Sequence, residues 1–443
     1  MKGLAEQIGV TERVFLIGAE LRKRTGADLT ETMAELAELA RTAGAEIIGE
    51  GTQRLDRPHA ATYIGKGKAT EFSEICKQGD VDTVIFDDEL SPAQTRNLER
   101  VFDCKVLDRT ALILDIFAQR ARTREGKMQI EMAQLQHILP RLTGLWTHLS
   151  RQKGGIGMRG DGESQLEVDR RRIQERISKL RRDLKEVKRV RQTQRQGRQR
   201  SQWPLVSIVG YTNAGKSTLL NALTGAEVVS EDRLFATLDP TIRRMELPGL
   251  GDAALVDTVG FISDLPTHLI DSFRATLEET LEADLLIHVR DRSEESDEER
   301  KQDVLSVLKR LEDESGQELP PIIEAWNKID LLPEDIQETL KLSARSGLQE
   351  TPAVATSAYT GEGIDDLLKL VQLSIQDELS TFLVRVLPSE GAVRAWLYEY
   401  GAVYDEVVQE DGSTDITVGL SEKHEGRFRS QFPDSDLIAT GNS

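Results

Sequence analysis

Eight residues near the middle of the chain, GYTNAGKS at 210–217, constrain its fold more than any other segment. They follow an apolar, β-branched stretch, LVSIV, and lead into a helix-favouring stretch, STLLNALTG, which is the strand–loop–helix context of a phosphate-binding loop. Glycines let backbone N–H groups approach phosphates, and the helix N-terminus favours negative charge. We expect Lys216 to reach the β- and γ-phosphates and the Ser217 hydroxyl to bind magnesium. The loop therefore predicts an α/β domain that binds a nucleoside triphosphate.

A second motif, NKID at 327–330, specifies the base. An aspartate can accept hydrogen bonds from both N1–H and the 2-amino group of guanine, whereas adenine offers neither arrangement. We therefore expect Asp330 to read the base and Asn327 to hold the loop and the purine edge. The aliphatic stem of Lys328 can lie over the ring. The segment Ser357–Ala358, after the stretch AVAT, is expected to supply a backbone N–H for the guanine carbonyl oxygen.

A third motif, DTVG, ends at Gly260 and completes the phosphate side. We expect Asp257 to hold magnesium through water and the Gly260 N–H to sense the γ-phosphate. The intervening segment LFATLDPT contains Thr237, the expected switch threonine on magnesium, with Thr241 as the alternative. Together the motifs predict a GTP-binding domain over residues 204–377.

The three motifs define one expected site with overlapping roles. The residues expected to contact the nucleotide are Gly210, Tyr211, Thr212, Asn213, Ala214, Gly215, Lys216, Ser217, Thr218, Phe235, Ala236, Thr237, Asp257, Thr258, Val259, Gly260, Asn327, Lys328, Asp330, Ser357 and Ala358. Those expected to serve hydrolysis directly are Lys216, Thr237 and Gly260. Those expected to hold Mg²⁺ are Ser217, Thr237 and, through water, Asp257.

Two positions of this site leave alternatives open. Phe261 stands where many GTPases place a glutamine that orients the attacking water, and a phenylalanine can do neither that nor act as a base. Either another residue of the domain takes the role, or turnover is slow until a partner completes the site, which is the interpretation we favour. The Asn213 carbonyl could ligate a potassium ion (K⁺) beside the phosphates, or its side chain could shape the loop by a hydrogen bond.

Residues 1–108 alternate between short apolar runs and amphipathic stretches, which predicts an N-terminal parallel α/β domain. Strands are expected at 14–21, 45–51, 82–88 and 104–108, and helices at 30–44 and 91–102. The acidic run at 87–89 could bind a metal, but a strand end leading to a helix cap explains it better. YIGKGK at 63–68 resembles a phosphate-binding loop in composition only, because it lacks the GKS ending.

Residues 109–200 are expected to form a long helical hairpin, a coiled coil with a Gly-rich basic loop. A helix-favouring run covers about 110–140, and a second helix starts near Ser164. The apolar positions of the second helix form a heptad seam at Leu166, Ile173, Ile177, Leu180, Leu184 and Val187. The stretch 192–204 reads as a linker because the heptad lapses there. Residues 378–443 predict a small C-terminal αβ domain.

Charge is uneven along the chain. Residues 151–200 hold 17 Lys/Arg and 7 Asp/Glu, whereas all 443 residues hold 57 basic and 76 acidic residues, for a net charge of −19. The basic segment reads equally as a solvated helix face or as an RNA-binding surface, but the acidic whole argues against indiscriminate coating of nucleic acid. Two cysteines exclude a disulfide scaffold. With no apolar run near the ~20 residues of a membrane span and no export signal, we expect a cytoplasmic protein.

Long segments outside the nucleotide motifs resemble those of the HflX family of ribosome-associated GTPases. They are YIGKGK, IFDDELSPAQTRNLE, DRTALILDIFAQRARTREGK and HLSRQKGGIGMRGDGESQLEVDRR, together with GYTNAGKSTL and FATLDPT. Two departures occur in the hairpin loop. Met158 and the segment 161–164 (DGES) stand where the family usually has threonine and Pro-Gly-Glu-Thr.

The resemblance implies GTP-dependent binding to the large ribosomal subunit and its rRNA, with the hairpin loop near the peptidyl-transferase region. It also implies splitting or rescue of stalled and stress-inactivated ribosomes, with slow basal GTP hydrolysis that ribosomes stimulate and that drives release. We expect a monomer. The rival hypothesis is an rRNA-binding scaffold or ribosome-assembly factor in which the nucleotide only stabilises the fold.

Overall fold

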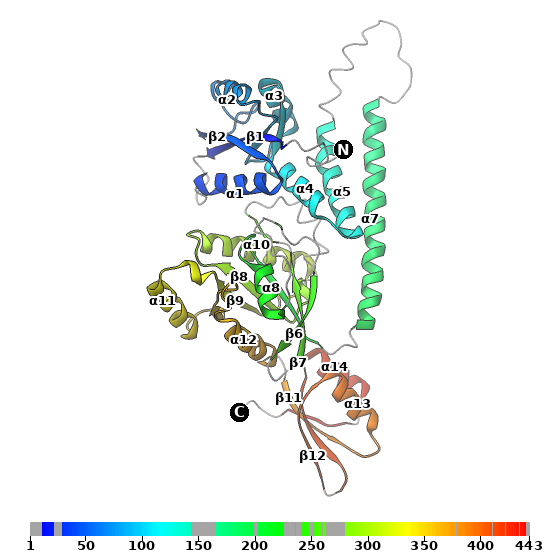
Figure 1. Cartoon of the computed structure of the whole chain (residues 1–443). Coiled ribbons are helices and arrows are strands. Elements are labelled where there is room, and N and C mark those ends of the chain that lie inside the picture. The colour runs from blue at the N-terminus through cyan, green and yellow to red at the C-terminus, as the bar shows by residue number, and fades with distance from the viewer. Residues whose placement is uncertain are drawn as a thin grey trace. The chain divides into compact units, whose positions relative to one another are not determined.

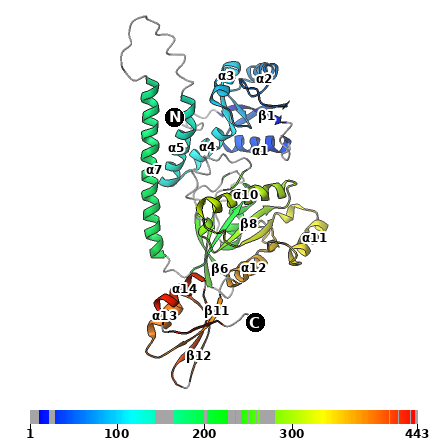
Figure 2. The ribbon, with the colours of Figure 1, turned by 180° about the vertical axis from the view of Figure 1, so that it is seen from behind.

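The computed structural model describes residues 11–21, 29–142, 165–198, 203–225, 235, 241–247, 251–258, 260–262, 280–377, 380–409, 411–420, 422–433 and 435–439. The chain divides into two compact units, which Figures 1 and 2 show from opposite sides. The first unit is Met1–Lys188 with Glu231–Asp239 and Asp264–Arg274, and the second is Arg189–Ser230, Pro240–Ser263 and Ala275–Ser443. Within the described ranges, no helix is long and apolar enough to cross a membrane.

The N-terminal part of the first unit is a four-stranded parallel sheet in the order β2-β1-β3-β4. Its strands are β1 (Arg13–Leu21), β2 (Glu46–Leu55), β3 (Thr83–Phe86) and β4 (Lys105–Asp108). Its helices are α1 (Leu29–Thr42), α2 (Lys66–Gln78) and α3 (Pro92–Phe102). Both views show α2 and α3 on one face of the sheet and α1 on the other (Figures 1 and 2). The predicted parallel α/β domain is therefore confirmed.

Local chemistry explains where α3 begins. The Ser91 side chain accepts from the Gln94 N–H at 3.3 Å, while the Gln94 side chain accepts from the Ser91 N–H at 2.9 Å, a reciprocal capping box with Pro92 at the first turn. The acidic run before this helix contributes to an ion pair. Asp87 accepts from Arg109 at 2.7 Å, and the described residues hold no group of three or more His, Cys, Asp or Glu suited to a metal ion.

The first unit also contains the helical pair. Its elements are α4 (Arg109–Arg120), α5 (Arg124–Ile138), the short helix η1 (Leu139–Arg141) and α7 (Gln165–Arg198), of which the residues from Arg189 on are assigned to the second unit. Figure 1 shows α7 as one long helix beside α5. Ile177 and Leu180 of α7 pack against Met128 and Met132 of α5, as the heptad spacing predicts.

Two expectations for the helical pair are wrong in detail. The run at 110–140 is two helices, α4 and α5, because the backbone of Ala121 is extended (φ −60°, ψ 116°) and Thr123 caps the second helix by accepting from the Gly126 N–H. The expected linker at 192–204 is helical as far as Arg198. Gln and Arg are good helix formers, so an exposed helix continues after its apolar seam ends.

The second unit contains a six-stranded sheet in the order β10-β9-β8-β5-β7-β6, parallel except that β6 runs antiparallel to β7. Its strands are β5 (Leu205–Gly210), β6 (Thr241–Leu247), β7 (Gly251–Asp257), β8 (Leu285–Asp291), β9 (Ile322–Asn327) and β10 (Ala353–Ala355). Its helices are α8 (Lys216–Thr224), η3 (Thr280–Glu282), α10 (Asp297–Ser315), η4 (Ile329–Leu331), α11 (Glu334–Arg345) and α12 (Ile364–Asp377). Apolar side chains of α8 and α12 pack on this sheet in one core.

The C-terminal part is a βαββαβ arrangement with an antiparallel sheet in the order β12-β13-β11-β14. Its elements are β11 (Ser380–Val386), α13 (Gly391–Tyr400), β12 (Ala402–Val408), β13 (Thr414–Leu420), α14 (Glu422–Gln431) and β14 (Leu437–Ala439). Buried residues of both helices, Trp396 and Phe428 among them, share one core with the sheet. The predicted small αβ part is thus present.

The α5–α7 contact gives a first prediction. Leu180 is 1% exposed, so Leu180→Ala should cost about 2–5 kcal/mol at this contact. Hydrogen exchange should show lower amide protection in α5 and α7, while α8 keeps its own. The exposed neighbour gives the control, Lys179→Ala, which should leave protection unchanged. If α5 and α7 showed the same amide protection in both variants, the apolar contact between these helices would not be what stabilises them.

Candidate nucleotide-binding site

Two glycines of the phosphate-binding loop occupy positions that no larger residue fits. Gly210 ends β5 with φ +151°, and a Cβ there would lie 2.4 Å from the Val289 carbonyl oxygen. Gly215 has φ +94°, and a Cβ there would lie 2.2 Å from the Asn327 Nδ2. Both positions therefore require glycine, because the loop packs directly on β8 and on the end of β9.

Lys216, the first residue of α8, points back into this loop. Its side chain is buried, and Nζ donates to the Tyr211 carbonyl oxygen at 2.6 Å. Burial lowers the pKa of Lys216 to about 8, although the charge of Asp257 opposes the shift. The ammonium group is thus held by a backbone carbonyl oxygen of the loop, where phosphate oxygens could replace that carbonyl as acceptors.

Ser217 and Asp257, two of the three expected magnesium ligands, lie side by side. The Ser217 Oγ donates to the Asp257 Oδ2 at 2.9 Å, and Asp257 is the last residue of β7. A hydroxyl and a carboxylate are the hard oxygen donors that Mg²⁺ prefers. The donor set therefore fits this ion. The third expected ligand, Thr237, lies outside the described residues, and its alternative, Thr241, stands opposite Asp257 in the β6–β7 register.

Asn327 joins the phosphate side of the site to the base side. Its Nδ2 donates to the Ala214 carbonyl oxygen at 2.8 Å, and its Oδ1 accepts from the Ala358 N–H at 2.9 Å. The side chain therefore connects the phosphate-binding loop with the loop after β10. Asp330 follows in η4 and is partly exposed. The structure thus brings NKID and Ser357–Ala358 to the phosphate-binding loop.

The segment after β7 also pairs with the phosphate-binding loop. The Phe261 N–H donates to the Gly210 carbonyl oxygen at 3.1 Å, and the Phe261 carbonyl oxygen accepts from the Thr212 N–H at 2.6 Å. A Cβ on Gly260 would lie 2.7 Å from Thr212 Cγ2 and 2.9 Å from Lys216 Nζ. Gly260 therefore sits directly against the loop lysine.

The remaining predicted residues differ in how the structure places them. Tyr211, Thr212 and Ala214 are buried, whereas Asn213 is exposed with φ +60°. Thr218 lies half-buried in α8. The hydroxyl of Thr258 donates to the Ile208 carbonyl oxygen at 2.6 Å, which ties this segment to β5.

Three predicted nucleotide contacts, Ala236, Thr237 and Val259, lie outside the described residues. Phe235 belongs to the first unit, where it is buried and its ring lies 4.6 Å, edge to face, from the ring of Phe117. In the described residues, Phe235 thus has a packing role.

Three residues that the sequence did not single out border the site from β8, the turn after it and α10. Asp291 pairs with Lys328 at 2.7 Å, and the Arg292 N–H donates to the Asn327 carbonyl oxygen at 3.0 Å. The Arg300 guanidinium lies 4.9 Å from the centre of the Tyr211 ring. A signal existed for Asp291, because it ends a buried strand of a parallel sheet, where functional loops begin.

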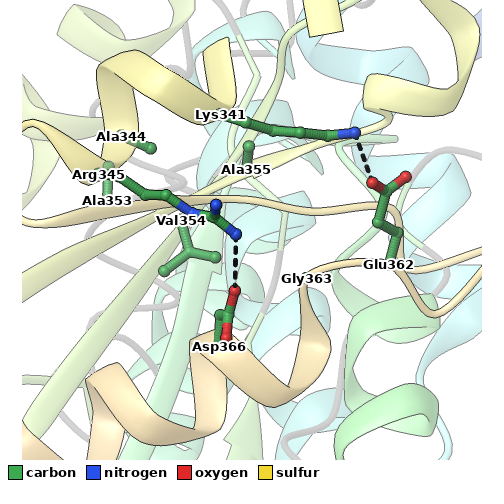
Figure 3. A pocket seen from close by; sticks show the side chains of 9 residues that line it. All are labelled: Lys341, Ala344, Arg345, Ala353, Val354, Ala355, Glu362, Gly363 and Asp366. Carbon is green, nitrogen blue, oxygen red and sulfur yellow. Dashed lines mark hydrogen bonds and ion pairs between the residues drawn. The ribbon is translucent and has the colours of Figure 1, made fainter. Parts of the chain in front are cut away.

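A separate pocket of about 430 Å³ lies at the edge strand β10, between α11 and α12 (Figure 3). Two ion pairs border it, Lys341–Glu362 at 2.5 Å and Arg345–Asp366 at 3.4 Å. Gly363 has φ +75°, and a Cβ there would lie 2.2 Å from the Ala355 carbonyl oxygen. None of the residues that line it belongs to the predicted site, so we assign it no part in nucleotide binding.

Comparison with known proteins is consistent across the chain. Four family models match in succession: "GTP-binding GTPase N-terminal" at 30–118, "GTP-binding GTPase Middle Region" at 120–198, "50S ribosome-binding GTPase" at 205–328 and "HflX C-terminal domain" at 342–433. Among solved structures, the complex of SsGBP with GDP matches with 26% identity and a TM-score of 0.48, covering 83% of this chain and 99% of that one.

Full-length relatives agree with these models. GTPase HflX of Escherichia coli K12 is 45% identical over 390 residues, which are 88% of this chain and 90% of that protein. GTPase HflX of Lacrimispora saccharolytica is 44% identical over 413 residues, 93% of this chain and 94% of that protein. With this identity over nearly the whole length, the chain belongs to the HflX family of GTPases.

Proposed function

We propose that this GTPase binds GTP between the phosphate-binding loop and the NKID loop. The observation that carries the proposal is the Asn327 side chain. It joins the NKID loop to the phosphate-binding loop through Ala214 and to the loop after β10 through Ala358. Lys216 binds the β- and γ-phosphates, and Asp330 accepts from the guanine edge. The hydrogen bonds of Asn327 thus hold the residues that bind the phosphates and the residue that binds the base in one frame.

Hydrolysis in this proposal depends on charge stabilisation at the γ-phosphate. The Lys216 ammonium and the Gly260 N–H face the transferred group, and Thr237 contributes to the same site. Ser217 and Thr237, with Asp257 acting through water, would hold Mg²⁺, which supplies positive charge to the phosphate oxygens when bound. Phe261 cannot orient the attacking water, so basal turnover is slow. The exposed Asn213 offers a carbonyl that K⁺ could use.

We propose further that the GTP-bound form binds the large ribosomal subunit and its rRNA and splits or rescues stalled ribosomes, with hydrolysis driving release. The family model for "50S ribosome-binding GTPase" supports the partner. So does the exposed basic surface of α7, formed by Arg170, Arg171, Arg172, Lys179, Arg181, Arg182 and Lys185. Basic side chains on such a surface pair with the phosphates of RNA and displace the counterions that surround them. A cytoplasmic monomer is part of the same proposal.

The base assignment predicts a change of nucleotide specificity. Asp330→Asn exchanges an acceptor for a donor, so affinity for GTP should fall roughly a hundredfold or more and xanthosine triphosphate should become the better ligand. Titration with fluorescent analogues measures both. Lys216→Ala is the control, because it should weaken both nucleotides alike. Unchanged GTP affinity in Asp330→Asn would refute the base-reading role.

The hydrolytic site predicts slow turnover that a partner accelerates. Large subunits should raise the hydrolysis rate at least about tenfold, since a missing water-orienting group costs on the order of 10²–10⁴ in rate. Phosphate release with and without purified subunits measures this, in potassium and in sodium buffers. A basal rate equal to the stimulated rate would contradict the incomplete site. Equal rates in the two salts would contradict only the potassium role of Asn213.

The hairpin loop gives a third functional prediction. Residues 150–162 lie outside the described residues, and their deletion should leave GTP binding intact but abolish ribosome splitting and much of the stimulated hydrolysis. Sedimentation of ribosomes in each nucleotide state measures splitting and binding, and binding of the intact protein should weaken steeply with salt. If the deletion variant split ribosomes at the normal rate, the loop would have no part in splitting and would serve only as a spacer. Equal affinity with GTP and GDP would favour the rRNA-binding scaffold instead.

A further inference from the structure

The end of β8 lies directly beside the base-reading loop. In the parallel register of β8 and β9, Asp291 stands opposite Asn327, so the two strands deliver these residues to the same edge of the sheet. The Arg292 N–H then donates to the Asn327 carbonyl oxygen at 3.0 Å. The chain that leaves β8 therefore supports the NKID loop at its first residue.

Asp291 is held by both of its carboxylate oxygens. Oδ1 accepts from the Ser293 N–H at 3.1 Å and from the Ser293 Oγ at 2.5 Å, while Oδ2 lies 2.7 Å from the Lys328 Nζ. The Asp291 side chain is 7% exposed and the Lys328 side chain 25%. This partial burial strengthens a charge-assisted contact relative to a surface ion pair.

Lys328 has a backbone that needs such support. Its φ is +62°, in the left-handed region that few lysines adopt, so the conformation persists only where neighbouring contacts determine it. A free lysine stem also samples many rotamers, which the Asp291 contact removes. Both the backbone and the ammonium of Lys328 are thus fixed before any base arrives.

The frame behind this contact is itself rigid. Burial would raise the pKa of Glu324 on β9, but hydrogen bonds from Trp326 and Lys301 and the charge of Arg290 outweigh it and lower the pKa to about 2. Glu324 therefore stays ionised and holds Arg290 of β8 at 2.8 Å. Arg290 directly precedes Asp291 in β8, so this ion pair ties β8 to β9 next to the residue that contacts Lys328.

We propose that Asp291 is a positioning residue for guanine recognition, which holds the Lys328 stem flat across one face of the purine. The proposal rests on the function proposed above, in which NKID reads the base. Asp291 acts on the ring face through Lys328, whereas Asp330 acts on the ring edge. The two carboxylates therefore divide base recognition between stacking and hydrogen bonding.

Asp291→Asn tests this assignment in the full-length chain. The Kd values for GTP, GDP and inosine triphosphate should all rise roughly tenfold by the same factor, because the stem contacts the ring whichever exocyclic group it carries. The hydrolysis rate at saturating GTP should not change, since the phosphate side is untouched. Glu298→Gln is the matched control, because it removes a carboxylate that contacts Arg290 at 2.8 Å without touching Lys328.

A double-mutant cycle separates positioning from general stability. Lys328→Met keeps an unbranched stem and removes the ammonium, so Asp291→Asn should add no further loss in that background. An equal additional loss there, or wild-type affinity in Asp291→Asn alone, would overturn the proposal.

A second variant covers the case in which Asp291→Asn does not fold. Ser293→Ala removes the Oγ donor and leaves the Asp291 Oδ1 with the Ser293 N–H alone. This should weaken GTP and inosine triphosphate alike, and unchanged affinity would overturn the proposal. If Asp330→Asn also leaves GTP affinity unchanged, the base-reading function fails as a whole. If Asp330→Asn switches specificity and the Asp291 variants have no effect, only the positioning role fails.

Discussion

Two hydrogen bonds of one buried side chain, Asn327, join the phosphate-binding loop to the loops at the base end of the site. Asn327 is 2% exposed, so water cannot replace a lost partner, and breaking either bond would leave a polar group unsatisfied at about 1–3 kcal/mol. The sheet makes the junction possible. Because β5, β8, β9 and β10 are successive parallel neighbours, their carboxyl ends bring the loops to one edge.

Much of the site is predictable because its chemistry is local in sequence. A loop of glycines, a lysine and a serine between a strand and a helix has few possible structures, and the structure places Ser217 beside Asp257. Asp291 is different, since its role depends on the register between β8 and β9. A slip of one residue would turn its side chain to the other face, and a single sequence does not record that register.

The fold shows the same division between local signal and tertiary context. Strands β1, β3 and β4 are short apolar runs, and they appear where the sequence predicts them. Strand β2 begins as predicted but continues through polar residues to Leu55, beyond the predicted end at Gly51. Helix α2 has few apolar residues and begins in the Gly-Lys stretch after Tyr63, so only its packing through Phe72 and Cys76 reveals it. Strand β12 lies at a sheet edge and is largely exposed, and α14 buries Phe428 within a polar sequence. A helix or strand whose apolar residues do not recur at a regular spacing depends on contacts with neighbouring elements for its structure.

Phe261 shows how backbone pairing can set the chemistry of a neighbouring residue. Its two backbone bonds to the phosphate-binding loop give it a strand-like position, and its ring is 2% exposed. A glutamine amide buried there would need partners of its own, whereas a phenyl ring needs none. The same pairing holds Gly260 against Lys216. Phe261 therefore cannot orient water, but its backbone keeps the Gly260 N–H in place. The group that orients the attacking water must therefore come from another position. A partner that accelerates hydrolysis would act by supplying or ordering that group near Gly260, because moving Phe261 would also break the pairing that holds Gly260 in place.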